Sequence, residues 1–167
     1  MFYRKHNNQL DILKGVQIDE PNIFVPWDID ENDFTNMFKN HSVYLVVEKN
    51  YSVKDVTILG ESHCNIGVVF NKTMCKIGVS RDICEEDNSL KDKSIKTPED
   101  FHAYLKKSFG IFQTALESAF GKPTKREEST TAPNFESCEW DIGNKIKIYH
   151  YVMDRFGLAE YLFIEKG

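Results

Sequence analysis

One long amphipathic segment in the second half of the chain limits most strongly how this sequence can fold. Residues 97–100 read Thr-Pro-Glu-Asp, which supplies a helix-capping residue, a proline at the first helical position and acidic residues in the first turn. Apolar side chains then recur every three or four residues along one helical stripe: Phe101, Leu105, Phe109, Phe112, Leu116 and Phe120. Gly121 and Pro123 end the helix. We expect this stripe to pack in the core rather than to form an exposed docking groove.

Segments typical of β-strands lie on both sides of this helix. Before it, β-branched and apolar runs cover 10–18, 42–48, 53–59, 65–70 and 74–80. After it, similar runs cover 138–142, 145–153 and 161–164. Gly143 and Asn144 are typical of a tight hairpin turn between two of these strands. The sequence therefore predicts an α+β fold, in which a mainly antiparallel sheet packs against the long helix.

A second, short helix is predicted near the N-terminus. Asp30 stands three residues ahead of Asp33, an arrangement typical of a helix cap, and the apolar Phe34 follows. Segment 22–25 lies between two prolines and cannot continue as a helix, so we expect it to be extended and packed on the domain. Polar stretches with no apolar period predict exposed loops at 81–96 and 125–135.

Composition and charge restrict the class of protein. The chain has 167 residues, of which 41% are hydrophobic and 13% aromatic, enough to build a core, and we expect residues 1–167 to form a single domain. The first eight residues lack the apolar run of a secretory signal, and no stretch has the length of a membrane span, so a cytoplasmic protein is expected. The net charge of −5 argues against a nucleic-acid partner, because such proteins gather Lys and Arg to neutralise phosphates.

No pattern in the sequence is typical of a catalytic, metal or nucleotide site. Cys64, Cys75, Cys84 and Cys138 have irregular spacings without a C-x-x-C pair, so we expect reduced thiols rather than a zinc site completed by His63. Residues 60–63 read Gly-Glu-Ser-His, but neighbouring strand residues point to opposite faces and cannot form a nucleophile with its base. We therefore expect no cofactor and no enzymatic activity.

Acidic side chains are the candidates for a binding surface. They form two clusters: Asp28, Asp30, Glu31 and Asp33 at the first helix, and Glu85, Glu86 and Asp87 in the central loop. Either they form an ordinary solvated face, or they complement a basic protein partner. Trp27 beside the first cluster is either an aromatic anchor for that partner or a core residue.

The C-terminal stretch carries a resemblance to a known class of proteins. It combines the helix end Phe-Gly-Lys-Pro at 120–123, a polar loop, Glu-Trp-Asp-Ile at 139–142 and a closing segment at 156–164. This pattern resembles the small acidic α+β immunity proteins of bacterial toxin systems, including contact-dependent growth inhibition. The resemblance implies stoichiometric binding to the C-terminal domain of a cognate toxin. Many toxins of this class are nucleases, whose basic substrate surface an acidic inhibitor would cover.

Two other classes of function remain open. A secretion chaperone or adaptor would show exposed apolar surface and form a homodimer. An enzyme of unrecognised type would bring Ser62, His63 or His150 together with carboxylates in a concave pocket. The sequence does not predict the oligomeric state.

Overall fold

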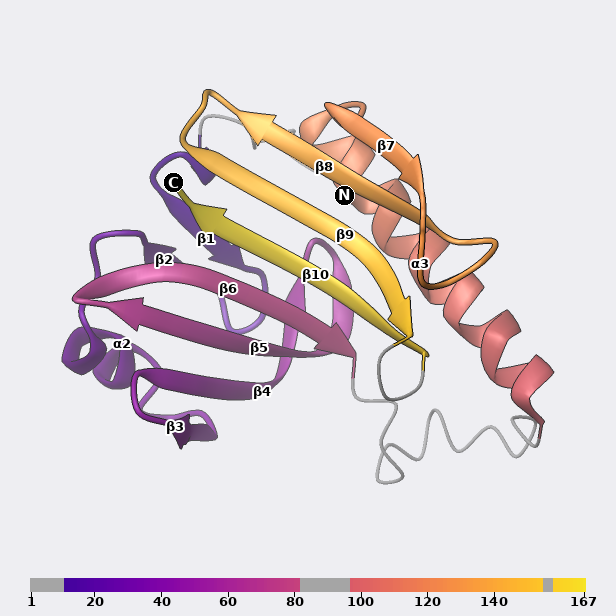
Figure 1. The fold of residues 1–167 in the computed structure, drawn as a ribbon. Helices are drawn as coiled ribbons and strands as arrows, with labels where there is room; N and C mark the ends of the chain where they lie inside the picture. Colours follow the sequence, from indigo (N-terminus) through magenta and orange to yellow (C-terminus); the bar gives the residue numbers. More distant parts are fainter. Residues whose placement is uncertain (1–10, 82–96, 155–157) are drawn as a thin grey trace, which may run out of the picture.

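The computed structural model describes residues 11–81, 97–154 and 158–167. Its elements in chain order are β1 (Gly15–Ile18), β2 (Ile23–Pro26), α2 (Glu31–Met37), β3 (Val43–Val47), β4 (Asn50–Ile58), β5 (Glu61–Asn71), β6 (Thr73–Arg81), α3 (Pro98–Phe120), β7 (Lys125–Glu128), β8 (Glu136–Ile142), β9 (Ile146–Asp154) and β10 (Leu158–Lys166). The predicted α+β class is confirmed, with strands far more abundant than helices (Figure 1).

One large antiparallel sheet dominates the fold. In the described part of the chain it has eight strands in the order β3-β4-β5-β6-β10-β9-β8-β7. Strands β3 to β6 form one meander and strands β7 to β10 form another, each preceded in the chain by a helix. The two meanders join through β6 and β10, which pair from Leu162↔Val79 to Glu165↔Lys76. The charged strand β7 and the apolar strand β3 are the outermost strands, at opposite ends of the sheet (Figure 1).

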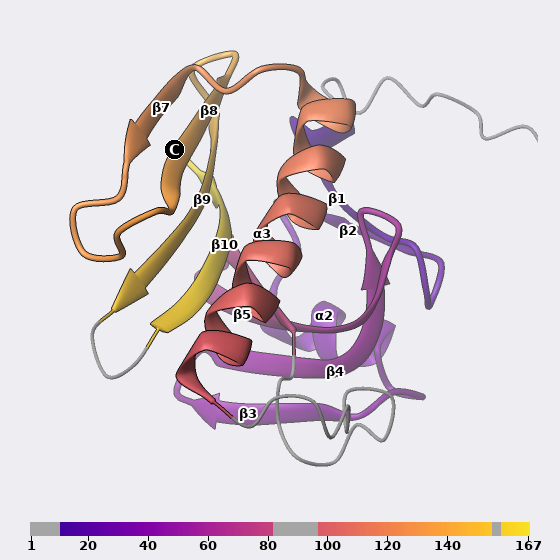
Figure 2. The same ribbon diagram turned by 90° about the vertical axis from the view of Figure 1, so that its right-hand side faces the viewer.

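The predicted long helix is confirmed with its capping residues. The Thr97 hydroxyl accepts a hydrogen bond from the Asp100 amide at 3.1 Å, and the Asp100 carboxylate accepts one from the Thr97 amide at 3.0 Å. Helix α3 lies against the concave face of the curved sheet (Figure 2). Its stripe is buried there through Leu105, Phe109, Phe112, Leu116 and Phe120. The core-packing interpretation of this stripe is thus confirmed.

The N-terminal elements cover another part of the same core. Val16 and Val25 of the β1–β2 hairpin, and Phe34 of α2, are buried in one cluster with Leu116 of α3. Gly15 is required at the hairpin, because a Cβ there would lie 2.3 Å from the Val25 carbonyl oxygen. Asp30 caps α2 as predicted, since its Oδ1 accepts from the Asp33 amide at 2.9 Å. Among the residues described, no helix is both long and apolar enough to cross a membrane.

Three predictions about the fold need correction. A sheet packed on one principal helix was too simple, because the curved sheet offers more apolar surface than α3 covers and the N-terminal hairpin and α2 cover the rest. The strand predicted at 10–18 begins only at Gly15. The predicted loop 125–135 contains strand β7, whose four side chains are all exposed and polar, so that it has no apolar period to reveal it.

Thr97→Ala tests the contribution of the capping box to α3. The change removes the side-chain acceptor of the Asp100 amide, so we expect the free energy of unfolding to fall by about 1 kcal/mol. Thr114→Ala is the matched control, because Thr114 is exposed on the same helix and its hydroxyl donates to the Gly110 carbonyl within the helix rather than capping an end. Urea unfolding followed by circular dichroism measures both. An equal loss in the two variants contradicts the prediction.

Candidate functional site

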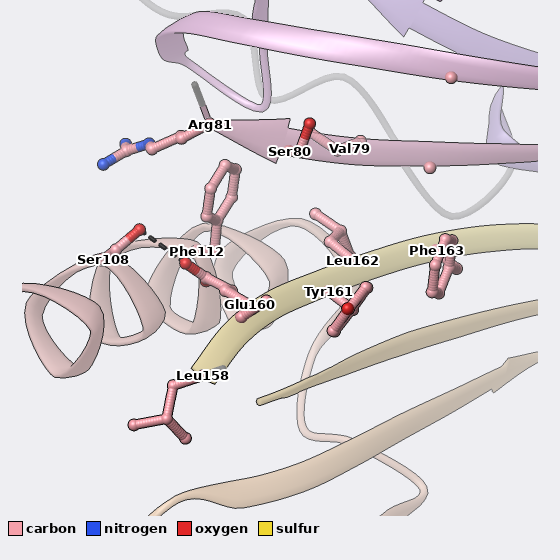
Figure 3. A pocket seen from close by; sticks show the side chains of 13 residues that line it. Val79, Ser80, Arg81, Ser108, Phe112, Leu158, Glu160, Tyr161, Leu162 and Phe163 are labelled. Carbon is pink, nitrogen blue, oxygen red and sulfur yellow. Dashed lines mark hydrogen bonds between the residues drawn. The ribbon is translucent and has the colours of Figure 1, made fainter. Parts of the chain in front are cut away.

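A cavity of about 380 Å³ lies at the seam between the two meanders. It arises because β6 and β10 pair only as far as Leu162↔Val79, after which β6 continues beside β5 and β10 follows β9. Figure 3 shows Arg81 and Ser80 of β6 on one side, Glu160 and Tyr161 of β10 on the other, and α3 behind them. The seam cavity is thus bounded by two separating strands and one helix.

Arg81 is the cation of the seam cavity. Its guanidinium pairs with Glu61 and lies 4.8 Å from the ring centroid of Phe112. Its Nε is buried and has no hydrogen-bond partner among the residues that the structure describes. A buried donor without an acceptor is costly, and this atom has under 1 Å² of accessible surface, so the N–H is an unsatisfied group of the packed interior.

A buried polar network forms the other side of the cavity. The Ser108 hydroxyl donates to Glu160 Oε2 at 2.6 Å, and His150 Nε2 lies 2.8 Å from Glu160 Oε1. His150 is fully buried, and its Nδ1 lies 2.9 Å from Gln113 Oε1. Gln113 donates its amide N–H to Glu117, which leaves the amide oxygen facing the histidine. The network joins β9 and β10 to α3.

The order of groups in this network does not match a serine nucleophile with its base. A catalytic serine gives its proton to an imidazole, which a carboxylate then orients. Here the carboxylate of Glu160 stands between Ser108 and His150, and the His150 ring is stacked on Phe109 with a centroid distance of 4.0 Å. The arrangement supports a structural role, in which each buried polar group has a partner.

From the sequence, His150 was expected near carboxylates only if the chain were an enzyme of unrecognised type, and Glu160, Ser108 and Gln113 were not predicted. One signal for His150 was present in the sequence. Its position continues the alternation of Ile146, Ile148 and Val152 on β9, and this parity marks the buried face. A histidine at such a position needs hydrogen-bond partners, although the sequence does not say which residues supply them.

The segment 60–63 does not assemble a catalytic group. Glu61 pairs with Arg81, His63 Nδ1 lies 3.1 Å from exposed Asp55, and Ser62 is exposed. Burial raises the pKa of Cys64 to about 11, so its thiol is poorly suited to act as a nucleophile or metal ligand. Within the described ranges, no three His, Cys, Asp or Glu side chains gather as metal ligands would.

A second candidate site is the outer edge of the sheet at β3. Four consecutive side chains of this strand are large, apolar and exposed: Tyr44 by 50%, Leu45 by 63%, Val46 by 64% and Val47 by 55%. Since alternate residues point to opposite faces, both faces of the strand are exposed to solvent. No strand in the described part of the chain pairs with its outer edge. We call these four residues the β3 surface.

The first acidic cluster lies beside the β3 surface. Asp28, Asp30 and Asp33 are exposed, as a solvated or partner-facing cluster requires. Glu31 accepts a hydrogen bond of 3.0 Å from the Tyr51 hydroxyl, and this bond raises the pKa of Tyr51. Tyr51 on β4 is the register partner of Leu45 in the middle of β3. Glu31 of this cluster is therefore linked to the apolar edge through Tyr51.

Trp27 does not belong to this surface. It is 2% exposed, and its indole N–H donates to the Ile12 carbonyl at 2.7 Å. The anchor interpretation of Trp27 is wrong, because the segment before α2 turns this side chain into the core, where its N–H has a partner. Glu85, Glu86 and Asp87 lie outside the described residues, so their predicted role stays a prediction.

Comparisons with known proteins give no family for the chain. A scan against protein-family models found no match, and searches of curated proteins and of solved structures found none either.

Glu160→Leu tests whether the seam network stabilises the fold. The change leaves Ser108 and His150 buried without their acceptor, so we expect the free energy of unfolding to fall by about 2 kcal/mol. Glu139→Gln is the control, because Glu139 forms a more exposed ion pair with Lys147. We expect this change to lower the free energy of unfolding by less than about 1 kcal/mol. Chemical denaturation measures both variants. Full stability of Glu160→Leu would contradict this role.

Proposed function

We propose that this chain is an immunity protein, which binds and neutralises a cognate bacterial toxin domain by stoichiometric protein–protein contact. The observation that carries the proposal is the exposed apolar edge at β3 beside the acidic N-terminus of α2. The C-terminal resemblance to toxin-immunity proteins supplies the biological class. The β3 surface itself supports only the more general function of binding a protein partner.

The two ends of the sheet differ in a way that supports partner binding at β3. An exposed edge strand presents unpaired backbone groups, and proteins commonly protect such edges with charged side chains. Strand β7 follows this rule, with the sequence Lys-Arg-Glu-Glu and every side chain exposed. Strand β3 has the sequence Val-Tyr-Leu-Val-Val instead. An apolar edge of this kind is suited to accept an added strand from a partner, whose side chains would cover both faces.

The acidic cluster favours a basic partner over a second copy of the chain. Two β3 strands paired antiparallel about a twofold axis would place both α2 helices on the same face of the joined sheet. Because Glu31 is linked through Tyr51 to Leu45, the middle residue of β3, the two acidic clusters would then approach each other. A partner with Lys and Arg beside its strand would instead meet opposite charge.

A secretion chaperone or adaptor is the second candidate. The exposed apolar β3 surface also fits this class, which would use the edge to form a homodimer. Light scattering on the purified chain separates the two. A monomer that becomes a one-to-one complex with a toxin domain supports the immunity function, and a stable homodimer paired through β3 supports the alternative.

Val46→Lys tests the β3 surface in toxin binding. A lysine on the edge opposes strand addition and places a positive charge where a basic partner binds, so we expect affinity to fall about tenfold or more, about 1.4 kcal/mol. The partner to test is the C-terminal domain of the protein encoded by the neighbouring open reading frame, and calorimetry measures its binding. Glu128→Lys on β7 is the control, since it adds a lysine to the opposite edge. Equal effects of the two changes would contradict a site at β3.

The same titration tests the acidic cluster through its salt dependence. Asp28→Asn with Asp33→Asn removes two exposed carboxylates without touching the Asp30 cap. We expect slower association and a weaker dependence of affinity on salt, because exposed charges act at long range and are screened by ions. An unchanged salt dependence would assign these carboxylates to an ordinary solvated face.

A further inference from the structure

The face of the large sheet that points away from α3, which we call the outer face, carries a cluster of aromatic side chains. Leu162 of β10 is buried in the core that the sheet shares with α3. Alternate strand residues point to opposite faces, so its neighbours Tyr161 and Phe163 lie on the outer face. Both line the seam cavity and are only half-buried (Figure 3). Arg81 and Glu160 contact α3 and therefore belong to the other face.

Three rings of the outer face lie close together. Tyr151 of β9 is the register partner of Tyr161, and their ring centroids are 5.4 Å apart. The Phe163 ring lies 5.9 Å from that of Tyr161 and 6.2 Å from that of Tyr151. Tyr149, the register partner of Phe163, lies beside them on the same face and is also half-buried. These rings offer one continuous apolar surface, with tyrosine hydroxyls available at its rim.

Small residues beside the rings leave space on the sheet. Gly67 and Gly78 are register partners, and Gly78 is in turn the partner of Phe163, so all three share the outer face. A Cβ on Gly78 would lie 3.0 Å from the Phe163 ring, whereas one on Gly67 would meet nothing within 4 Å. Ser80 follows on the same face, where β6 separates from β10, and it also lines the cavity. The outer part of the seam cavity thus has a wall of rings and an open floor.

The charged side chains next to the rings are paired with one another. Lys76 forms an ion pair with Glu165, and its Nζ lies 4.0 Å from the centroid of the Phe163 ring. On the other side of the cluster, Lys147 Nζ lies 3.1 Å from Glu139 Oε1. Each positive charge is thus balanced by a negative one on the same face, which leaves none to attract an oppositely charged partner. The aromatic cluster therefore favours an uncharged partner.

The free polar groups of the cluster are hydroxyls. Within the described ranges, no residue forms a hydrogen bond with the hydroxyl of Tyr151 or Tyr161. Burial, with smaller contributions from Tyr161 and Glu165, raises the pKa of Tyr151, so its hydroxyl keeps its proton and can donate. Ser80 adds an exposed hydroxyl. A partner that fits these groups presents hydrogen-bond acceptors together with apolar surface.

A proline-rich segment has this combination of properties. Proline has an apolar ring and no backbone N–H, so a run of prolines brings no donor that would need an acceptor. In the polyproline II conformation the backbone makes no internal hydrogen bonds, and its carbonyl oxygens remain free to accept. The conformation is formed before binding, which lowers the entropy cost of binding in an aromatic-lined groove.

We propose that the outer part of the seam cavity binds an uncharged, proline-rich segment of a partner protein in the polyproline II conformation. Proline rings pack over Gly67 against Phe163 and Tyr161. Backbone carbonyls of the segment accept hydrogen bonds from the hydroxyls of Tyr161 and Tyr151. The site and the β3 surface lie on different strands, so this partner does not compete for the edge of the sheet.

Titration with a capped polyproline peptide of about ten residues, observed by ¹H–¹⁵N NMR on the full chain, tests the proposal. We expect the peptide at millimolar concentration to shift the amides of Gly67, Gly78, Tyr151 and Tyr161. A capped Gly-Ser peptide of equal length is uncharged but lacks the rings and the ordered conformation, so we expect it to bind more weakly. Cellohexaose tests whether the rings prefer an uncharged sugar, and we expect weaker binding there too.

Substitutions at two positions identify the binding surface. Tyr161→Ala removes a ring, and we expect it to weaken polyproline binding about tenfold or more. Tyr161→Phe keeps the ring and removes the hydroxyl, so we expect a smaller loss of about threefold. Gly67→Leu fills the open floor and should also weaken binding. Phe24→Ala is the matched control, because it removes an aromatic ring that is 39% exposed on the separate β1–β2 hairpin.

Thermal unfolding confirms that each variant is folded before its binding is compared. Binding that is weakened by Tyr161→Ala and Gly67→Leu and unchanged by Phe24→Ala supports the proposal. No shift with polyproline, shifts confined to other parts of the chain, or unchanged binding by Tyr161→Ala overturns it. Tighter binding of the Gly-Ser peptide or of cellohexaose overturns it as well.

Discussion

Pairing between β6 and β10 is the contact on which the rest of this structure depends. Four register pairs, from Leu162↔Val79 to Glu165↔Lys76, join two meanders that the chain forms separately. Helix α3 stabilises this junction from the concave side, where Phe112 and Leu116 belong to the core cluster shared by both halves. The short pairing also creates the seam cavity, because the two strands separate where it ends. The same contact thus forms the fold and opens a site within it.

The parts of the fold that follow local rules could be predicted from the sequence. The capping residues and the stripe of α3 are encoded within 24 neighbouring residues at 97–120, and the structure confirms them. The order of strands was not accessible, since β6 and β10 lie far apart in the sequence and no local pattern specifies their pairing. Strand β7 was missed because an edge strand with both faces exposed needs no apolar alternation.

The candidate sites, like the fold, could be predicted from the sequence only where local composition reveals them. The acidic residues at 28–33 were found from charge alone, and the structure adds that Glu31 is linked through Tyr51 to the apolar edge at β3. The apolar run of β3 was read correctly as a strand, but its composition is that of a buried strand, and only the sheet order reveals it as an edge. Trp27 was ambiguous because an indole suits both a core and an interface. The seam network required tertiary contacts that spacing does not encode.

Hydrogen–deuterium exchange of the chain, free and bound to the C-terminal domain of the proposed cognate toxin, tests whether β3 is the binding edge. Amides on the outer edge of β3 should exchange quickly in the free protein, because no described strand pairs with them. Strand addition by the toxin domain predicts that residues 43–47 become protected in the complex, while β7 at the other edge is unchanged. A complex in which β3 keeps its fast exchange and protection appears elsewhere would contradict the assignment of β3 as the binding edge.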